Sequence, residues 1–202
     1  MLFRSAVGPG VVGSGADARI AELLALWLPS NHDPERPLMT LATVSADGWP
    51  NARTVLLSSY DAEGFCFHTD AHSTKIAEAD ATGRAALMLH LPAQARQLVV
   101  QGTVEPTDAD EQAWAYRRRP EYLRTLAWLN TDAFAALPDA ERVRAWADFG
   151  ARNPDPEPPS TWTGRRVRPL RLLFWSGSTE TASRRQCFTR VGDTWREELR
   201  AG

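Results

Sequence analysis

The chain has 202 residues, 43% of them hydrophobic and 24% charged, which is ordinary for a globular protein of one large domain or two small ones. Its formal net charge of −2 gives no electrostatic reason to expect a nucleic acid or an anionic membrane as partner. No apolar run approaches the roughly 20 residues that a membrane-spanning helix needs. The N-terminus lacks the pattern of a signal peptide, and Cys66 and Cys187 match no disulfide or metal spacing. We therefore expect a cytoplasmic protein.

The first half of the chain changes from a helical to a strand-like pattern. Residues 1–16 are glycine-rich and predict a loose arm, and helical spacing of apolar residues predicts a helix over 18–28. Beyond a loop at 31–37 the period becomes that of β-strands, with turn chemistry at Asp47-Gly48. We expect strands over 38–44, 51–57, 64–69, 85–91 and 96–105, a bulge at Gly102, and a short helix over 74–80 capped by Ser73.

The second half of the chain predicts helices followed by further strands. Helical patterns cover 108–118, 121–129 and 138–149, a proline-rich connector covers 153–159, and strands are expected over 167–175, 186–191 and 194–199. The predicted fold is mainly β with peripheral helices, a barrel or a sandwich. We divide the chain into an arm and helix (1–30) and one domain (31–202) that carries a helical insertion (108–150) and the C-terminal strands.

Lys75 is the only lysine in the chain, and the other 22 of the 23 lysine and arginine residues are arginines. Arginine therefore supplies most of the generic positive charge, and a surviving lysine marks a site where a compact point charge is needed. Lys75 follows a strand-like run and opens a helix-like one, where N–H groups and the helix dipole favour a phosphate. The alternative is a solvated lysine in a first helical turn.

No motif of a protein nucleophile, a nucleotide-binding loop or a metal site is present, so we predict no metal and assign no catalytic residue. Arg53 on a strand and Ser73 and Lys75 at a helix start, with Arg96 and Gln97 on a later strand, suit a phosphorylated planar ligand. A protein without an acid–base pair often leaves the chemistry to a cofactor.

Ten short blocks occur in a characteristic order along the chain. They are LATV at 41–44, DGWP at 47–50, RTVLL at 53–57, GFCFHT at 64–69, STK at 73–75, RQ at 96–97, GTVE at 102–105, RP at 119–120, PPSTW at 158–162 and FWSG at 174–177. In order and spacing they resemble the pyridoxamine 5′-phosphate oxidase family. The resemblance implies an FMN-binding split β-barrel that works as a homodimer, with flavin at the subunit interface and a small molecule as substrate.

The resemblance also assigns roles to individual residues. Arg53 and Lys75 match the residues that hold the FMN phosphate, and Arg119 matches a ligand of the substrate phosphate. His68 stands where the family usually has a tyrosine, and Thr74 where a second basic residue is common. The implied cofactor-binding residues are Arg53, Thr54, Val55, Leu56, His68, Thr69, Ser73, Thr74, Lys75, Gln97, Trp175 and Arg185.

The departures from the family pattern concentrate at the substrate site. Ser58 replaces a lysine, and Thr181 and Ser183 replace an arginine and a histidine that face the substrate. Two further substrate-site positions and one flavin-contacting pair also differ; they are Ala115, Leu123 and Asp132-Ala133. Each lost charged ligand removes about 1.5–3 kcal/mol of binding. The pattern keeps most of the flavin set and little of the substrate set.

Three hypotheses follow from this pattern. The first is an FMN-dependent oxidase that takes a hydride from a small amine, alcohol or other reduced substrate and does not act on pyridoxamine phosphate. The second is a genuine pyridoxamine or pyridoxine phosphate oxidase with a rebuilt pocket, in which Arg119, Arg184 and Tyr116 replace the lost contacts. The third is a flavin- or deazaflavin-binding module without oxidase activity.

Overall fold

The computed structural model describes residues 11–12 and 15–202, and the rest of the predicted arm lies outside this range. Val11 and Val12 form strand β1, which pairs with Glu197 and Arg196 on the edge of the sheet. Helix α1 then begins at Gly15, earlier than predicted. The prediction of a loose arm is therefore wrong for these residues, because a sheet edge and the core supply partners that the local sequence does not show.

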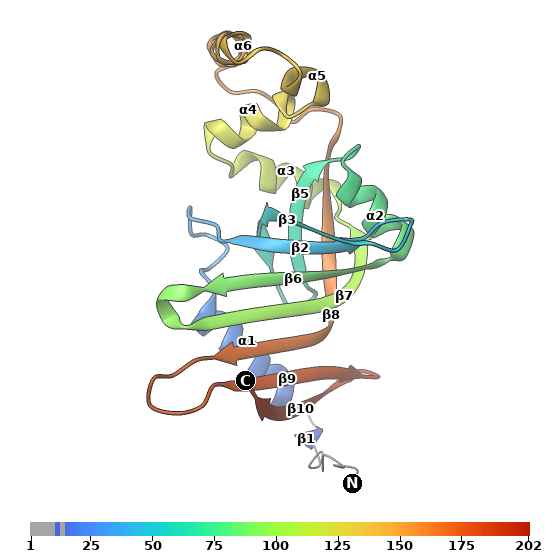
Figure 1. Ribbon diagram of the computed structural model, residues 1–202, viewed down its shortest axis with the longest axis vertical. Helices are drawn as coiled ribbons and strands as arrows, with labels where there is room; N and C mark the ends of the chain where they lie inside the picture. The colour runs from blue at the N-terminus through green and yellow to red at the C-terminus, as the bar shows by residue number, and fades with distance from the viewer. Residues whose placement is uncertain (1–10, 13–14) are drawn as a thin grey trace.

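One curled antiparallel sheet forms the body of the protein (Figure 1). Its main order is β1-β10-β9-β8-β7-β6-β2-β3, while β5 pairs with β4 and with the first part of β8. The strands are β1 (Val11–Val12), β2 (Leu38–Val44), β3 (Pro50–Leu56), β4 (Ser59–Tyr60), β5 (Phe65–Asp70), β6 (Arg84–Leu91), β7 (Arg96–Pro106), β8 (Trp162–Ser176), β9 (Arg184–Val191) and β10 (Thr194–Ala201). The prediction of a mainly β fold with peripheral helices is confirmed.

Strand β8 gives the sheet its curl. Its first half pairs with β5 and its second half with β9, while β7 runs along both halves. The register between β7 and β8 shifts at Gly102, which confirms the predicted bulge. A Cβ at Gly102 would lie 1.9 Å from the carbonyl oxygen of Arg168, so only glycine allows the two strands this close approach.

The core lies on the inner face of the sheet, where alternate residues of each strand point. Leu41, Leu87, Leu98 and Val100 are fully buried there. Helix α1 (Gly15–Trp27) covers part of this face, with Ile20, Leu23 and Leu24 in the same cluster and the Trp27 ring 5.1 Å from that of Phe174. Apolar residues that alternate with polar ones in the strand sequences are thus the residues buried on the inner face of the sheet.

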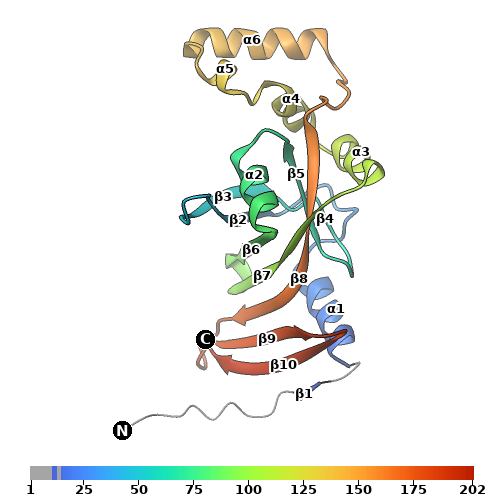
Figure 2. The ribbon, with the colours of Figure 1, turned by 90° about the vertical axis from the view of Figure 1, so that its right-hand side faces the viewer.

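Four of the remaining helices lie at the end of the molecule opposite α1 (Figure 2). They are α3 (Ala109–Arg117), α4 (Glu121–Leu129), α5 (Asp132–Ala135) and α6 (Asp139–Arg152). Helix α2 (Thr74–Thr82) packs beside β2, β6 and β7, and a 3-10 turn, η1 (Pro92–Gln94), joins β6 to β7. No residue of α6 is buried; it packs on α4 and α5 through aromatic pairs such as Tyr122 with Trp146. No helix in the described part of the chain is long and apolar enough to cross a membrane.

The structure extends one strand beyond its predicted start and adds a helix. Strand β8 begins at Trp162, where the sequence predicted a start at 167, because residues 162–167 pair with β5. The helix predicted over 121–129 is confirmed with the same bounds. Helix α5 was not predicted; its N-cap is Thr131, whose hydroxyl accepts a hydrogen bond from the Phe134 amide.

Candidate functional site

The turn from β5 into α2 brings Lys75 to the mouth of a large pocket. Ser73 occupies the N-cap position of α2, but its hydroxyl donates to the Asp70 carbonyl oxygen and does not cap the helix. The first N–H groups of a helix have no partner within it, so an uncapped first turn is suited to an anion. The predicted N-cap position is therefore confirmed, without the predicted side-chain bond.

Lys75 is half-buried and lies near Thr69, Arg53 and Asp70. Its Nζ donates to Thr69 Oγ1 at 3.2 Å. Burial lowers the pKa of Lys75, and the nearby positive charge of Arg53 lowers it further, while Asp70 opposes both effects. A bound anion would relieve the repulsion between the two cations, so their proximity itself favours a phosphate or a similar group.

Arg53 is held in place by a carboxylate that the sequence did not single out. Its Nη2 donates to Glu78 Oε2 at 3.0 Å, and its Nη1 donates to Thr43 Oγ1. Glu78 also accepts from Thr43 Oγ1 at 2.5 Å and from Asn51 Nδ2 at 2.6 Å, and these bonds lower its pKa. The Glu78 side chain is 5% exposed, so this network fixes the Arg53 guanidinium from behind.

Arg53 and Lys75 line a pocket of about 790 Å³, the Arg53 pocket, which extends from β5 and α2 to the helical insertion. Its other lining residues are Thr69, Asp70, His72, Ser73, Thr74, Ala127, Trp128, Asn130, Thr131, Asp132, Ala135, Pro159, Ser160 and Thr161. Predicted phosphate ligands from a strand, a turn and a helix start therefore meet in one place.

A second pocket of about 290 Å³, the His68 pocket, adjoins the first and shares Thr69, Asp70, Lys75, Ala127 and Asn130 with it. One wall is the β3 segment Thr54–Leu56, the stretch expected to line a planar ring. The other lining residues are Leu38, His68, Arg119, Leu123, Leu126 and Trp162. The two pockets together offer an apolar slot that ends in a pair of cations.

His68 is deeply buried in the wall of the second pocket. It is 4% exposed, and its ring stacks on Trp162 with centroids 5.5 Å apart and planes 13° from parallel. Burial, and then the charge of Arg119, lower the pKa of His68 to about 3, so the imidazole is neutral. Arg119 donates from Nη2 to the His68 carbonyl oxygen at 3.1 Å and lies 4.4 Å above the Trp162 ring.

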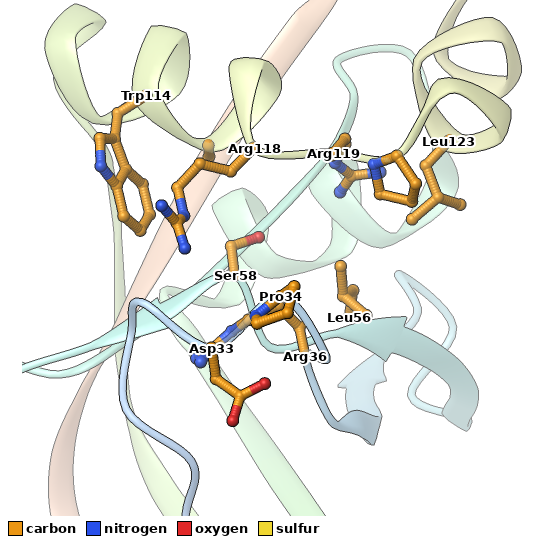
Figure 3. A pocket seen from close by; sticks show the side chains of 11 residues that line it. Asp33, Pro34, Arg36, Leu56, Ser58, Trp114, Arg118, Arg119 and Leu123 are labelled. Carbon is orange, nitrogen blue, oxygen red and sulfur yellow. The ribbon is translucent and has the colours of Figure 1, made fainter.

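A third, smaller pocket of about 190 Å³, the Ser58 pocket (Figure 3), shares Leu56, Arg119 and Leu123 with the His68 pocket. The Ser58 hydroxyl is buried and has no hydrogen-bond partner. Arg118 and Arg119, which follow α3, both line this pocket, and in Figure 3 the Arg118 guanidinium lies beside Ser58, whose hydroxyl points away from it. Burial lowers the pKa of Arg119 to about 10, which leaves it charged at neutral pH.

Three predicted cofactor residues lie elsewhere, on neighbouring strands of the sheet. Gln97 on β7 pairs with Trp175 on β8, and Trp175 pairs with Arg185 on β9. None of the three lines the Arg53 or His68 pocket of the described chain. The structure therefore divides the predicted cofactor residues into a pocket group and a group of three across the sheet.

Sequence reasoning missed two residues of the pocket region. Glu78 stands three residues after Lys75, a spacing that brings both to neighbouring positions on one helix face, so the helix prediction contained the signal. Trp162 lay inside a block shared with the family, but nothing in its own neighbourhood marks it as the partner of His68 and Arg119. That contact depends on the pairing of β8 with β5.

Comparison with known sequences identifies the family. The sequence model described as "Pyridoxamine 5'-phosphate oxidase" matches residues 29–157. The chain belongs to the pyridoxamine 5′-phosphate oxidase family. A pyridoxine/pyridoxamine 5′-phosphate oxidase of Rubrobacter xylanophilus is 37% identical over 203 residues, covering 96% of this chain and 92% of the relative. One from Alkalilimnicola ehrlichii is 33% identical over 187 residues, covering 90% and 94%.

Solved structures of related proteins share the fold. PhzG of Burkholderia lata, crystallised with tetrahydrophenazine-1-carboxylic acid, superimposes with a TM-score of 0.71 at 23% identity, covering 94% of this chain and 91% of PhzG. A pyridoxamine 5′-phosphate oxidase-related, FMN-binding protein of Nostoc punctiforme gives 0.64 at 16% identity, covering 92% and 95%. The predicted split barrel is thereby confirmed, in a family of flavin-binding oxidoreductases.

No cluster of three or more residues with metal-binding side chains occurs in residues 11–12 and 15–202. The polar atoms of the site fit a different ligand, one with an anionic end and a flat body. The anionic end matches Arg53, Lys75 and the start of α2, and the flat body matches the slot between Thr54–Leu56 and the His68–Trp162 pair. This family member therefore has side chains suited to a flavin mononucleotide.

Proposed function

We propose that the protein is an FMN-dependent oxidoreductase that oxidises a small molecule other than pyridoxamine phosphate. The observation that carries this proposal is the continuity of the Arg53 and His68 pockets, which share Lys75 and Thr69. When bound, FMN would supply the redox chemistry by accepting a hydride equivalent on its ring. The chain would then need only to bind, orient and shield the reactants, which agrees with the lack of a recognisable protein nucleophile.

Each part of the pocket group has a proposed task. Arg53 and Lys75 bind the phosphate, with Ser73, Thr74 and the first turn of α2 completing its surroundings. Thr54, Val55 and Leu56 lie against one part of the ring, and Thr69 holds the Lys75 ammonium. The apolar walls of the His68 pocket exclude water from the ring, which strengthens the polar contacts inside it.

The second group of predicted residues supports a homodimer. Gln97, Trp175 and Arg185 lie side by side on three strands and outside the pockets of their own chain. If all the predicted cofactor residues contact one flavin, the two groups come from different subunits. We therefore propose two FMN molecules at a subunit interface, and measurement of the mass in solution tests this arrangement.

The substrate end of the site supports a substrate other than pyridoxamine phosphate. Ser58, Ala115 and Leu123 line the Ser58 pocket at positions where the family has ligands for the substrate phosphate. Arg119 alone keeps its family identity there. With about 1.5–3 kcal/mol lost per missing charged hydrogen bond, the affinity for such a phosphate would fall by several orders of magnitude.

A genuine pyridoxamine phosphate oxidase remains the second candidate, and one observation favours it. Arg118 and Arg119 both border the Ser58 pocket, so two guanidinium groups are near the place of the lost ligands (Figure 3). Relatives 33% and 37% identical carry that name. The proposed tasks of Arg53 and Lys75 are the same under both candidates, which differ only in the substrate.

One measurement tests cofactor binding, and a second separates the candidates. Titration of the purified protein with FMN, followed by flavin fluorescence, tests cofactor binding; Lys75→Arg should bind FMN more weakly although the charge is kept, because the planar fork does not reproduce the contacts of the ammonium. Formation of pyridoxal phosphate from the amine and alcohol forms by the FMN-loaded protein would favour the second candidate. Bound flavin that no donor reduces would favour a binding module without oxidase activity.

A further inference from the structure

A buried carboxylate stands behind the Arg53 pocket. Glu78 lies on α2, and its side chain is 5% exposed, whereas the side chain of Arg53 is 22% exposed. Glu78 lines none of the three pockets, so it can affect a ligand there only through its neighbours. Because a carboxylate is costly to bury without donors, Glu78 depends on the groups that surround it.

The donors to Glu78 come from the β2–β3 pair. Thr43 Oγ1 donates to Oε2 at 2.5 Å, Asn51 Nδ2 donates to Oε1 at 2.6 Å, and Arg53 Nη2 donates to Oε2 at 3.0 Å. Thr43 and Asn51 are opposite each other in the strand register, and the Thr43 hydroxyl also accepts from Arg53 Nη1. The guanidinium is therefore held at both terminal nitrogens, and its remaining N–H groups stay available for a ligand.

Glu78 also links Arg53 to Lys75. Lys75 and Glu78 are three positions apart on α2, so they are neighbours on one face of the helix. Burial, and then the charge of Arg53, lower the pKa of Lys75, which shows that the two cations are close enough to repel each other. A guanidinium without a counter-charge would turn away from the ammonium. The Glu78 carboxylate supplies that counter-charge from outside the pockets.

We propose that Glu78 is a positioning residue, which holds the Arg53 guanidinium beside Lys75 in the flavin-free protein and so raises the affinity for the phosphate of the ligand without touching it. The inference rests on the proposed function, in which that phosphate belongs to FMN. A site whose cations are already in place loses little free energy in ordering them when the phosphate binds. A role in packing alone would instead affect every ligand of the two pockets.

Glu78→Ala tests this role, because FMN and riboflavin share the ring but only FMN carries the phosphate. The affinity for FMN should fall about 10- to 30-fold, and the affinity for riboflavin should change by less than about twofold. Glu78→Gln should stay within about threefold of wild type for FMN, because the amide offers an oxygen to Arg53 and an N–H to Thr43 Oγ1. If Glu78→Ala does not fold, Glu78→Asp replaces it: the shorter side chain keeps the charge but withdraws from Arg53, so the affinity for FMN alone should fall about threefold to tenfold.

Asp80 provides a matched control on the same helix. Its carboxylate also pairs with an arginine, since Arg165 donates from Nε at 2.8 Å and from Nη2 at 2.7 Å, but neither residue lines any of the three pockets. Asp80→Ala should therefore leave both flavin affinities unchanged.

A double-mutant cycle shows whether Glu78 acts through Arg53. In the Arg53→Gln background, Glu78→Ala should change the affinity for FMN by less than about twofold, because the group that it positions is gone. Independent losses that add in the double variant would overturn the proposal, as would an unchanged FMN affinity in the variant that folds. Equal losses for FMN and riboflavin would make Glu78 a structural residue, and a gain in FMN affinity would make it a competitor of the phosphate for Arg53; either result also overturns it. If the wild-type protein binds neither flavin, the proposed function fails and this inference with it, whereas the other results contradict the role of Glu78 alone.

Discussion

Lowering the pH should reduce the free energy of unfolding through His68, because its imidazole is buried and resists protonation in the folded protein. The pKa of His68 is lowered to about 3 in the folded protein, whereas the unfolded chain has the ordinary value near 6.5. Between these two values the unfolded state binds a proton that the folded state does not. Stability from this residue is therefore complete above about pH 6.5 and is lost as the pH falls toward the folded value.

The expected loss from this one residue is about 2 kcal/mol between pH 8 and pH 5, and about 3 kcal/mol by pH 4. Urea denaturation of flavin-free protein across this range measures the total free energy of unfolding. The contribution of His68 is the difference between wild type and His68→Phe, because all other ionisable side chains are the same in both proteins. Parallel curves for the two proteins would mean that the pKa of His68 is the same in the folded and unfolded states, which contradicts its burial beside Arg119.

Further predictions concern the cation pair and the backbone. Lys75→Met should weaken FMN binding by about 10- to 100-fold and leave riboflavin binding unchanged, measured by fluorescence quenching, because only FMN carries the phosphate; equal losses for both ligands would place Lys75 at the ring. Gly102→Ala should cost about 1–3 kcal/mol in urea denaturation, because its Cβ meets the Arg168 carbonyl oxygen. In contrast, Gly150→Ala in helix α6, where a Cβ meets nothing within 4 Å, should stabilise by about 0.5–1 kcal/mol. Asp80→Asn should cost less than about 1 kcal/mol although Arg165 bonds both oxygens, because the Asp80 side chain is 50% exposed.

Most strands could be predicted from strand-like runs in the sequence. Strand β2 was predicted with its observed bounds, and in the structure Met39, Leu41 and Thr43 alternate with less buried neighbours. The pairing partners were not predictable in this way. The first part of β8, WTGRRV at 162–167, shows no simple alternation of apolar and polar residues, and its start at Trp162 follows from its pairing with β5. Likewise, β1 exists only because β10 offers an open edge.

The site could be predicted in part, because some of its chemistry is local and some is not. Lys75 was conspicuous as the only lysine at a strand–helix junction, and the structure brings it beside Arg53. The network of Glu78 with Thr43 and Asn51 was not predicted, since it joins a helix to two strands that are distant in sequence. The stacking of His68 on Trp162 joins residues 94 positions apart, which no local pattern reveals.

The binding of FMN by the purified protein is the central claim, and an equilibrium titration tests it most directly. With riboflavin and FMN titrated in parallel, the account predicts saturable quenching of flavin fluorescence by both, an endpoint of one FMN per chain, and tighter binding of FMN through Arg53 and Lys75. A protein that stays colourless and leaves FMN fluorescence unchanged would contradict it, as would equal affinities for the two flavins.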